Sequence, residues 1–356
     1  MNKLFLIYYR KTMKTLLLFL SICFLFIQCS SGNGDDGKPY VFDKQENIDF
    51  NSIDYPEILG ISMQLVKIDS LLLINDFHGD TLINVFNLNS GKIVKRLIPK
   101  GSGPGELISP LDIQLCDRNL YVLCRPKFSL NHGSVDSVTA GSFVISNDGL
   151  LPQKSDRFIP LTENQFVFSG LWNKRYILYN PSKASEIKEF GDYPNYWEGE
   201  KDFPENAKAM FHQSRFIKHP SKPYFASCSS FVLEIYEYDS TGINLPQLVF
   251  KKQLGNYSYN YTAGNILTAN VKDGSDPEAK ELACSAKYIY VVIQSGEDRK
   301  KSNIMVLDWD GKPVKLLKSD KTITCLSIDE NSNRGYCIIE DPEDKLVYFD
   351  LQTSKY

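Results

Sequence analysis

Short stretches in which apolar and polar residues alternate run through most of the chain. Such alternation is typical of β-strands with one buried face, and Asn, Asp and Gly between them adopt the positive φ angles of tight hairpin turns. The pattern therefore predicts an all-β protein. The clearest strand–turn–strand stretches are 81–97, 141–151, 174–190, 231–254 and 303–317, and a last strand lies in 346–356.

A second short strand pair precedes most of these stretches, so the repeating unit has four strands and occurs six times. Residues 39–356 number 318, or 53 for each repeat. This is longer than a WD40 blade of roughly 40–45 residues and close to a kelch blade of roughly 50. The sequence predicts a six-bladed β-propeller. Seven blades are the alternative, if 256–280 contains a degenerate blade.

The sixth repeat, 324–351, has three strands and lacks an outer one. The segment 40–48 near the N-terminus has no inner partner. We expect it to pair with the sixth repeat, so that an N-terminal strand closes the ring. The alternative is that 40–48 packs as a separate edge strand.

The first 28 residues have the features of an export signal. Four basic residues and no acidic one accompany the twelve-residue run Leu16–Ile27, which is apolar except for Ser21. A run of this length is too short to span a bilayer as a helix and is typical of a signal peptide. Residues 1–28 are therefore predicted to be a signal peptide, and Met13 is an alternative start.

The apolar run ends near Cys29, which small polar residues follow, and this resembles the signal of bacterial lipoproteins. The resemblance implies that Cys29 is lipidated and anchors an outer-membrane lipoprotein, either in the periplasm or on the cell surface. Gln28 departs from the usual small residue, so a plain secretory signal is the alternative. Residues 29–38 are predicted to be a flexible tether to a single domain, 39–356.

The basic leader hides part of the acidity of the chain. The full chain has a net charge of −3 at pH 7. Without residues 1–28 it has 36 basic and 43 acidic residues, a net charge of −7. Since nucleic-acid binding needs a basic stripe, we expect no nucleic-acid partner.

Six cysteines follow Cys29. An exported chain can form disulfides, but their spacing matches no small disulfide framework, and several lie among alternating apolar residues. Most are therefore predicted to be unpaired, and no Cys-x-x-Cys or Cys/His cluster indicates zinc. The six are Cys116, Cys124, Cys228, Cys284, Cys325 and Cys337.

One junction between predicted blades carries a Gly-x-Gly-Pro-Gly-Glu motif, formed by Gly101, Gly103, Pro104, Gly105 and Glu106. It lacks the Lys-Ser/Thr of a phosphate loop and leads into a strand, so it is interpreted as a turn that needs glycine. The motif, the signal, the tether and the blade rhythm together resemble the TolB-like six-bladed propeller lipoproteins, relatives of NHL-repeat propellers. The resemblance implies the fold and an envelope location, and no established reaction.

Propellers usually meet ligands at the central channel or at the face where the second-to-third-strand loops and the blade junctions gather. Aromatic side chains in these loops can stack on sugars or clamp peptides, although they can also fold onto their own blades. The candidates for binding a protein or glycan are Asp76, His78, Arg125, Trp172, Tyr193, Tyr196, Trp197, His212, Arg215, Tyr257 and Tyr259.

The sequence contains no catalytic motif. It has no Gly-x-Ser-x-Gly elbow, and its four histidines lack metal-site spacing. We expect a monomeric binding module without a cofactor. The alternative is a calcium-dependent hydrolase or lyase of the lactonase type, in which oxygen ligands at the channel mouth hold the metal. The available carboxylates are Asp76, Glu106, Asp112 and Glu340.

Overall fold

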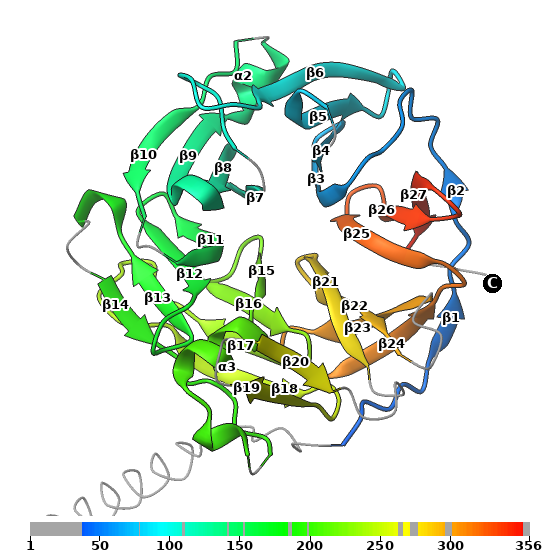
Figure 1. Cartoon of the computed structure of the whole chain (residues 1–356). Coiled ribbons are helices and arrows are strands. Elements are labelled where there is room, and N and C mark those ends of the chain that lie inside the picture. The colour runs from blue at the N-terminus through cyan, green and yellow to red at the C-terminus, as the bar shows by residue number, and fades with distance from the viewer. Residues whose placement is uncertain are drawn as a thin grey trace, which may run out of the picture. The chain divides into compact units, whose positions relative to one another are not determined.

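The computed structural model describes residues 38–77, 79–108, 111–140, 142–151, 154–183, 187–197, 199–262, 266–270, 277–295 and 301–351. They form small β-sheets arranged in a ring around a central axis (Figure 1). No helix among these residues is long and apolar enough to cross a membrane. Cys29 and His78, two residues of the predicted sites, lie outside the described residues.

Six antiparallel sheets, or blades, form the ring, and each has its first strand nearest the axis. Blade 1 contains β3 (Ser62–Ile68), β4 (Leu71–Asp76), β5 (Thr81–Asn87) and β6 (Lys92–Pro99). Blade 2 contains β7 (Leu111–Cys116), β8 (Asn119–Cys124), β9 (Ser129–Ser134) and β10 (Ser146–Leu150). Blade 3 contains β11 (Ser155–Thr162), β12 (Gln165–Gly170), β13 (Tyr176–Tyr179) and β14 (Ile187–Phe190).

The second half of the ring repeats the arrangement. Blade 4 contains β15 (Arg215–Lys218), β16 (Tyr224–Ser229), β17 (Val232–Glu237) and β18 (Gln247–Gln253). Blade 5 contains β21 (Glu278–Cys284), β22 (Tyr288–Gln294), β23 (Ser302–Asp308) and β24 (Pro313–Lys318). Blade 6 contains β25 (Thr322–Asp329), β26 (Arg334–Glu340) and β27 (Asp344–Asp350).

An N-terminal strand closes the ring, as predicted, but it is not the predicted segment. The outer strand of blade 6 is β2 (Asn51–Ser52), which pairs antiparallel with β27. The predicted segment contains β1 (Gln45–Asn47), which instead adds a parallel fifth strand to β24 of blade 5. Lys315 contacts the N-terminal and the C-terminal segments of the propeller. Its Nζ donates to Oε2 of Glu46 at 2.8 Å and to the carbonyl of Leu351 at 2.7 Å.

The structure corrects one predicted hairpin. Residues 141–151 contain the single strand β10, which pairs with β9 and shifts register between Asn147 and Gly149. The Asn-Asp-Gly sequence there is a β-bulge in place of a turn. The turn predicted between β5 and β6 is confirmed, because Gly91 has a φ of +63° and the Asn87 side chain accepts the N–H of Asn89 at 2.9 Å.

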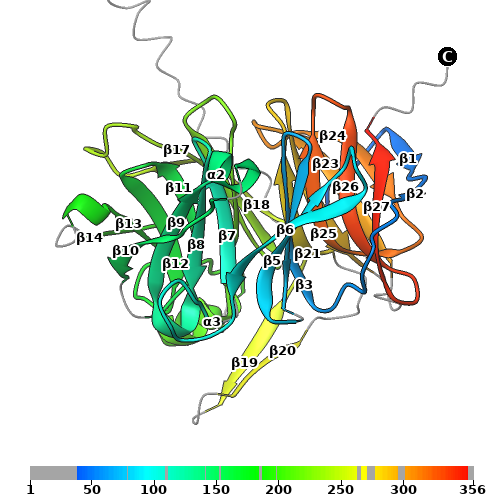
Figure 2. The same ribbon diagram turned by 90° about the horizontal axis from the view of Figure 1, so that it is seen from above.

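Two insertions stand between blades. The first joins blades 3 and 4 and contains η3 (Glu200–Asp202) and α3 (Glu205–Phe211). The second joins blades 4 and 5 and forms a hairpin of β19 (Ser258–Thr262) and β20 (Ile266–Asn270), which projects from the ring in Figure 2. A two-stranded hairpin is not a blade, so the ring has six blades. The other short helices are η1 (Arg125–Lys127), α2 (Val135–Thr139) and η2 (Pro181–Lys183).

The hydrophobic core lies between adjacent blades. Every residue of β4 is buried, because a blade packs both of its faces against neighbours. Leu73 of blade 1 and Val122 of blade 2 belong to one cluster, and Val306 of blade 5 and Cys337 of blade 6 belong to another. The six cysteines of the described residues are free, as predicted, and five of them are buried.

Candidate functional site

The first strands of the six blades line the central channel (Figure 1). Each follows the loop that leaves the outer strand of the preceding blade, so all six begin at the same end of the ring. We call this end the mouth. Polar side chains at the beginning of these strands therefore converge, although they are far apart in the sequence.

Two hollows occupy the channel. One, of about 330 Å³, is lined by residues of all six inner strands. The other, of about 320 Å³, is lined by residues of blades 3, 4 and 5 and by Met210 and Phe211 of the first insertion, and we call it the mouth hollow. Glu281 and Leu282 line both hollows, so the middle of β21 lies between them.

Four charged residues, which we call the mouth charges, come from four neighbouring inner strands. They are Asp112 of β7, Arg157 of β11, Arg215 of β15 and Glu281 of β21. Nη1 of Arg157 lies 3.3 Å from Oδ1 of Asp112. Nη1 of Arg215 lies 3.2 Å from Oε2 of Glu281. Two guanidinium–carboxylate pairs from different blades thus meet at the mouth.

Asp112 is buried and has several donors. Its Oδ1 accepts Nε2 of Gln64 at 2.9 Å, and its Oδ2 accepts the backbone N–H of Phe158 at 3.1 Å. Burial raises the pKa of Asp112 above its ordinary value, and the nearby Arg157 opposes that shift. Its oxygens are occupied by blades 1 and 3, so Asp112 has a structural role in linking them.

Glu281 is a partly exposed member of the mouth charges. Its Oε1 accepts the backbone N–H of Leu282 at 2.9 Å, and Arg215 pairs with its other oxygen. Burial raises the pKa of Glu281, and Arg215 opposes that rise. The Arg215 side chain is 36% exposed, so its guanidinium reaches the solvent of the mouth hollow.

Arg125, on η1 of blade 2, adds another guanidinium near this network. Burial and then the like charge of Arg157 lower its pKa. Its Nε is buried and has no hydrogen-bond partner among the described residues. A guanidinium placed beside a second one is a common arrangement for binding an anion.

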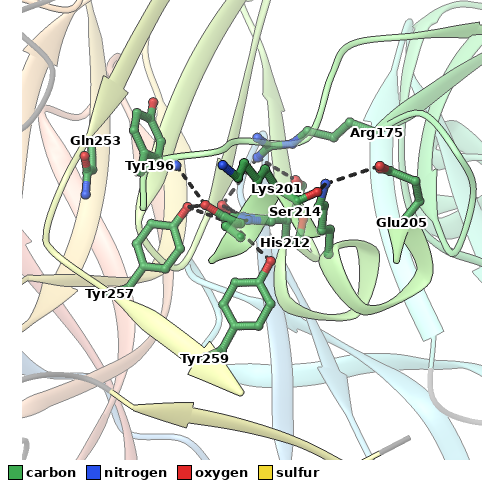
Figure 3. Close-up of polar contacts among 12 residues, drawn as sticks. Arg175, Tyr196, Lys201, Glu205, His212, Ser214, Gln253, Tyr257 and Tyr259 are labelled. Carbon is green, nitrogen blue, oxygen red and sulfur yellow. Dashed lines mark hydrogen bonds and ion pairs between the residues drawn. The ribbon is translucent and has the colours of Figure 1, made fainter. Parts of the chain in front are cut away.

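The first insertion is fastened by a buried carboxylate (Figure 3). Glu200 is fully buried, and its Oε1 lies 2.8 Å from Nε2 of His212. The hydroxyls of Tyr257 and Tyr259 donate to the same oxygen at 3.2 and 3.1 Å, and the N–H of Tyr196 donates to Oε2 at 2.8 Å. This group, the Glu200 cluster, joins the two insertions.

Burial lowers the pKa of His212 to about 4, even though the hydrogen bond to Glu200 opposes that shift. The imidazole is therefore neutral at neutral pH, and its Nε2–H donates to the carboxylate. The rings of Tyr257, Tyr259 and Phe211 stack on one another, which buries the apolar parts of the cluster.

A buried ion pair links blades 3 and 4. Nη1 of Arg175 is 3.2 Å from Oε1 of Glu234, and both side chains are 1% exposed. The hydroxyls of Tyr176 and Tyr236 donate to Oε2 of Glu234 at 3.0 Å each. Blades 3 and 4 are thereby joined by a fully satisfied carboxylate.

The structure separates the predicted ligand-face residues into two groups. Arg125 and Arg215 lie near or in the mouth hollow. The loop aromatics lie in packed clusters: Tyr193, Tyr257 and Tyr259 are buried, and Tyr196 and Trp197 are half-buried against them. His212 is buried, Trp172 packs against the blade 2–3 core, and Asp76 accepts the N–H of Gly60 at 3.1 Å. The binding role of these residues remains a prediction.

The glycine motif forms a closed turn, as the sequence analysis interprets it. Oε2 of Glu106 accepts the N–H of Gly103 at 2.8 Å, and Gly105 has a φ of +75°. A Cβ on Gly101 would lie 2.1 Å from Oε2 of Glu106. Glycines at these positions let the carboxylate fold over the turn.

The carboxylates considered for calcium have different surroundings, and Asp76 accepts the N–H of Gly60 at 3.1 Å. Glu106 folds into its own turn, Asp112 pairs with Arg157, and Glu340 is exposed at the end of β26. Among the residues that the structure describes, no group of three or more His, Cys, Asp or Glu side chains is placed to hold a metal ion.

Sequence reasoning missed several residues of these networks. Arg157 and Glu281 at the mouth are single charges inside strands, and Glu200, Arg175 and Glu234 are charges within buried surroundings. The available signal was a charged residue near the beginning of each of several inner strands, once the strands are aligned by blade.

A ring of six four-stranded blades around a lined channel defines a six-bladed β-propeller. The model of the family TolB-like 6-blade propeller-like matches residues 50–331, and the chain belongs to that family. No curated protein matches the chain.

Two solved structures have the same fold. A candidate exported protein of Bacteroides fragilis is 13% identical, with a TM-score of 0.56, over 86% of this chain and 98% of its own. A member of the DUF4221 family from Bacteroides vulgatus is 10% identical, with a TM-score of 0.55, over 86% of this chain and 98% of its own. At these identities the likeness concerns the fold.

Proposed function

We propose that this protein is a lipid-anchored envelope propeller that binds a protein or glycan partner at the mouth of its channel. The observation that carries the proposal is the mouth hollow of about 320 Å³. The charged side chains of Arg157, Arg215 and Lys280 line it. Ligand sites of proteins are concave and carry a few fixed polar groups on a rigid scaffold.

The scaffold suits a binding role. Arg157 and Arg215 stand on inner strands whose neighbours are fixed by blade packing, so the guanidiniums need little ordering when a ligand arrives. The Glu200 cluster holds α3, and hence Phe211, at the side of the hollow. No catalytic group is assigned, because the described carboxylates of the mouth are taken up by ion pairs and backbone donors.

The place where the chain enters the ring supports presentation of the mouth. The Tyr40 hydroxyl donates to the carbonyl of Gly311 at 2.9 Å, in the turn between β23 and β24. Because strand direction alternates within a blade, that turn lies at the end opposite the mouth. A chain anchored at Cys29 would reach Lys38 through nine residues, about 30 Å when extended. That length leaves room for the mouth to face away from the membrane.

An extracytoplasmic location agrees with the signal-like leader and with the description of the Bacteroides fragilis structure as a candidate exported protein. Lipidation is tested by growing cells with a labelled fatty acid. We expect label on the wild-type chain and none on Cys29→Ala. Equal labelling of both, or no label on either, would contradict the anchor.

Binding is tested on a glycan array and with an immobilised library of envelope proteins, using the purified chain. We expect a partner that binds wild type and is lost with Arg215→Glu. Arg118→Glu is the control, since Arg118 lies in the turn after β7, at the end opposite the mouth. Equal binding by wild type and Arg215→Glu would exclude the mouth as the binding face.

A further inference from the structure

Resting on the proposed binding role, we infer that the mouth hollow recognises a carboxylate group on its ligand. The inference comes from the hydrogen-bonding groups of the hollow: among the described residues, most arginine donors lack a protein partner, whereas the carboxylate acceptors have one. An arginine side chain has five N–H donors and no acceptor, and its planar edge fits a carboxylate with two parallel hydrogen bonds.

The donors of the hollow are largely unused. Within the described residues, Arg157 forms one ion pair, with Asp112, and Arg215 forms one, with Glu281. Each contact engages a single Nη1, so the remaining N–H groups of both guanidiniums have no protein acceptor there. The two side chains are 17% and 36% exposed and both line the mouth hollow.

The acceptors of the mouth are, in contrast, occupied. Asp112 is 2% exposed and receives Gln64, Arg157 and the N–H of Phe158. Glu281 receives Arg215 on one oxygen and the N–H of Leu282 on the other. Glu278, the other carboxylate that lines the hollow, pairs with Lys280 at 2.6 Å. A ligand that enters the hollow therefore meets guanidinium donors without a protein acceptor in the described part of the chain, and an acceptor on the ligand fits them best.

A further guanidinium strengthens this preference. Arg125 has no ion pair among the described residues, and it lies close enough to Arg157 for the two charges to repel. The carboxylates of Asp112 and Asp156 offset part of this repulsion, and an anionic ligand group would add to their effect, which a neutral ligand would not do. Lys280 also lines the hollow, but its charge is balanced by Glu278 at 2.6 Å, so the preference rests on the arginines.

The size and walls of the hollow limit the rest of the ligand. A volume of about 320 Å³ suits a unit the size of a sugar or an amino acid. Phe211 and Leu282 form an apolar wall, and Met210 is 39% exposed beside them. The recognised unit is thus small, acidic and partly apolar, such as a uronic acid or an acidic amino-acid residue.

The test is a calorimetric titration of the full-length protein with glucuronate and with N-acetylglutamate, each beside its neutral counterpart, glucose or N-acetylglutamine. We expect at least one acid to bind at least ten times more tightly than its neutral counterpart. Binding of glucuronate alone would identify a sugar acid as the source, and binding of N-acetylglutamate alone an acidic peptide.

Two variants make the result specific to the mouth. Arg215→Lys keeps the charge but loses the two-pronged geometry, so we expect the acid to bind at least ten times more weakly. Arg125→Gln, which breaks no ion pair of the described residues, should also weaken binding. Arg118→Lys should bind as wild type does. Thermal melting of each variant checks that it is folded.

Binding of neither acid, equal binding of an acid and its neutral counterpart, or unchanged binding by both Arg215→Lys and Arg125→Gln would overturn the inference. A preference for inorganic phosphate over both acids would also overturn it. If a partner binds the mouth in the array experiment but neither acid competes with it, the proposed function stands and the carboxylate preference alone fails.

Discussion

Nε2 of His212 lies 2.8 Å from Oε1 of Glu200, and neither side chain reaches solvent. Glu200 is the first residue of η3 and His212 follows the last residue of α3, and the carboxylate also receives the hydroxyls of Tyr257 and Tyr259 from the other insertion. A single buried carboxylate thus fixes both insertions beside the mouth. Met210 and Phe211 of α3, which line the hollow, depend on this contact for their position.

The tyrosine hydroxyls of the Glu200 cluster can be removed one at a time. Tyr259→Phe should lower the free energy of unfolding by about 1.5–3 kcal/mol, because a hydrogen bond to a buried carboxylate is lost. Urea unfolding measures this change. Tyr288→Phe on β22 is the control and should change it little. A change of Tyr259→Phe no larger than that of the control would contradict the role of Glu200.

Stability should depend on the protonation of His212. The unfolded chain binds a proton near the ordinary pKa of 6.5, whereas the folded chain does so only at about 4. The free energy of unfolding should therefore fall as the pH drops from 6.5 towards 4, by up to about 3 kcal/mol from this residue.

His212→Gln keeps a hydrogen-bond donor and removes the titration. Urea unfolding at several pH values should give a flatter dependence between pH 6.5 and 4 for this variant than for wild type. An unchanged slope in His212→Gln would show that the imidazole is not held neutral.

The buried pair of Arg175 and Glu234 should be sensitive to loss of its cation. Arg175→Met leaves Glu234 buried without its principal cation. We expect the free energy of unfolding to fall by about 3–5 kcal/mol. The neighbouring Lys174→Met removes the exposed pair with Asp192, and no measurable change is expected. Equal effects in urea unfolding would mean that the burial of the pair has no energetic consequence.

The glycine motif gives a conformational prediction. Gly105 has a φ of +75° and open space around it, so Gly105→Ala should cost about 1 kcal/mol through backbone strain alone. Gly105→Asn should cost less, because asparagine tolerates this conformation better. Thermal melting of both variants compares their losses of stability. A larger loss for Gly105→Asn than for Gly105→Ala would contradict the claim that the backbone at Gly105 is strained for other residues.

The fold followed from local patterns. Alternating strands and Asn/Asp/Gly turns recur with a regular period, and six repeats of four strands leave few other arrangements. The prediction was wrong where a short sequence is compatible with two local structures. The sequence Asn147-Asp148-Gly149 fits a turn or a bulge, and the pairing of β10 with β9 decides for the bulge.

The site was less predictable. Arg215 and Arg125 could be named from loop positions, but Arg157 and Glu281 could not, because a single charge within a strand gives no sign of the channel. The loop aromatics were ambiguous for a physical reason. Tyr257 and Tyr259 are buried because they pack on Phe211 and because Glu200, 57 and 59 residues away in the chain, accepts their hydroxyls.

The central claim is that partners bind at the mouth, and hydrogen exchange with and without a partner from the binding screen tests it most directly. We predict slower exchange at the beginnings of β11, β15 and β21, around Arg157, Arg215 and Glu281, and no change in the turns at the opposite end, such as the one at Arg118. Slower exchange confined to those opposite turns would contradict the account.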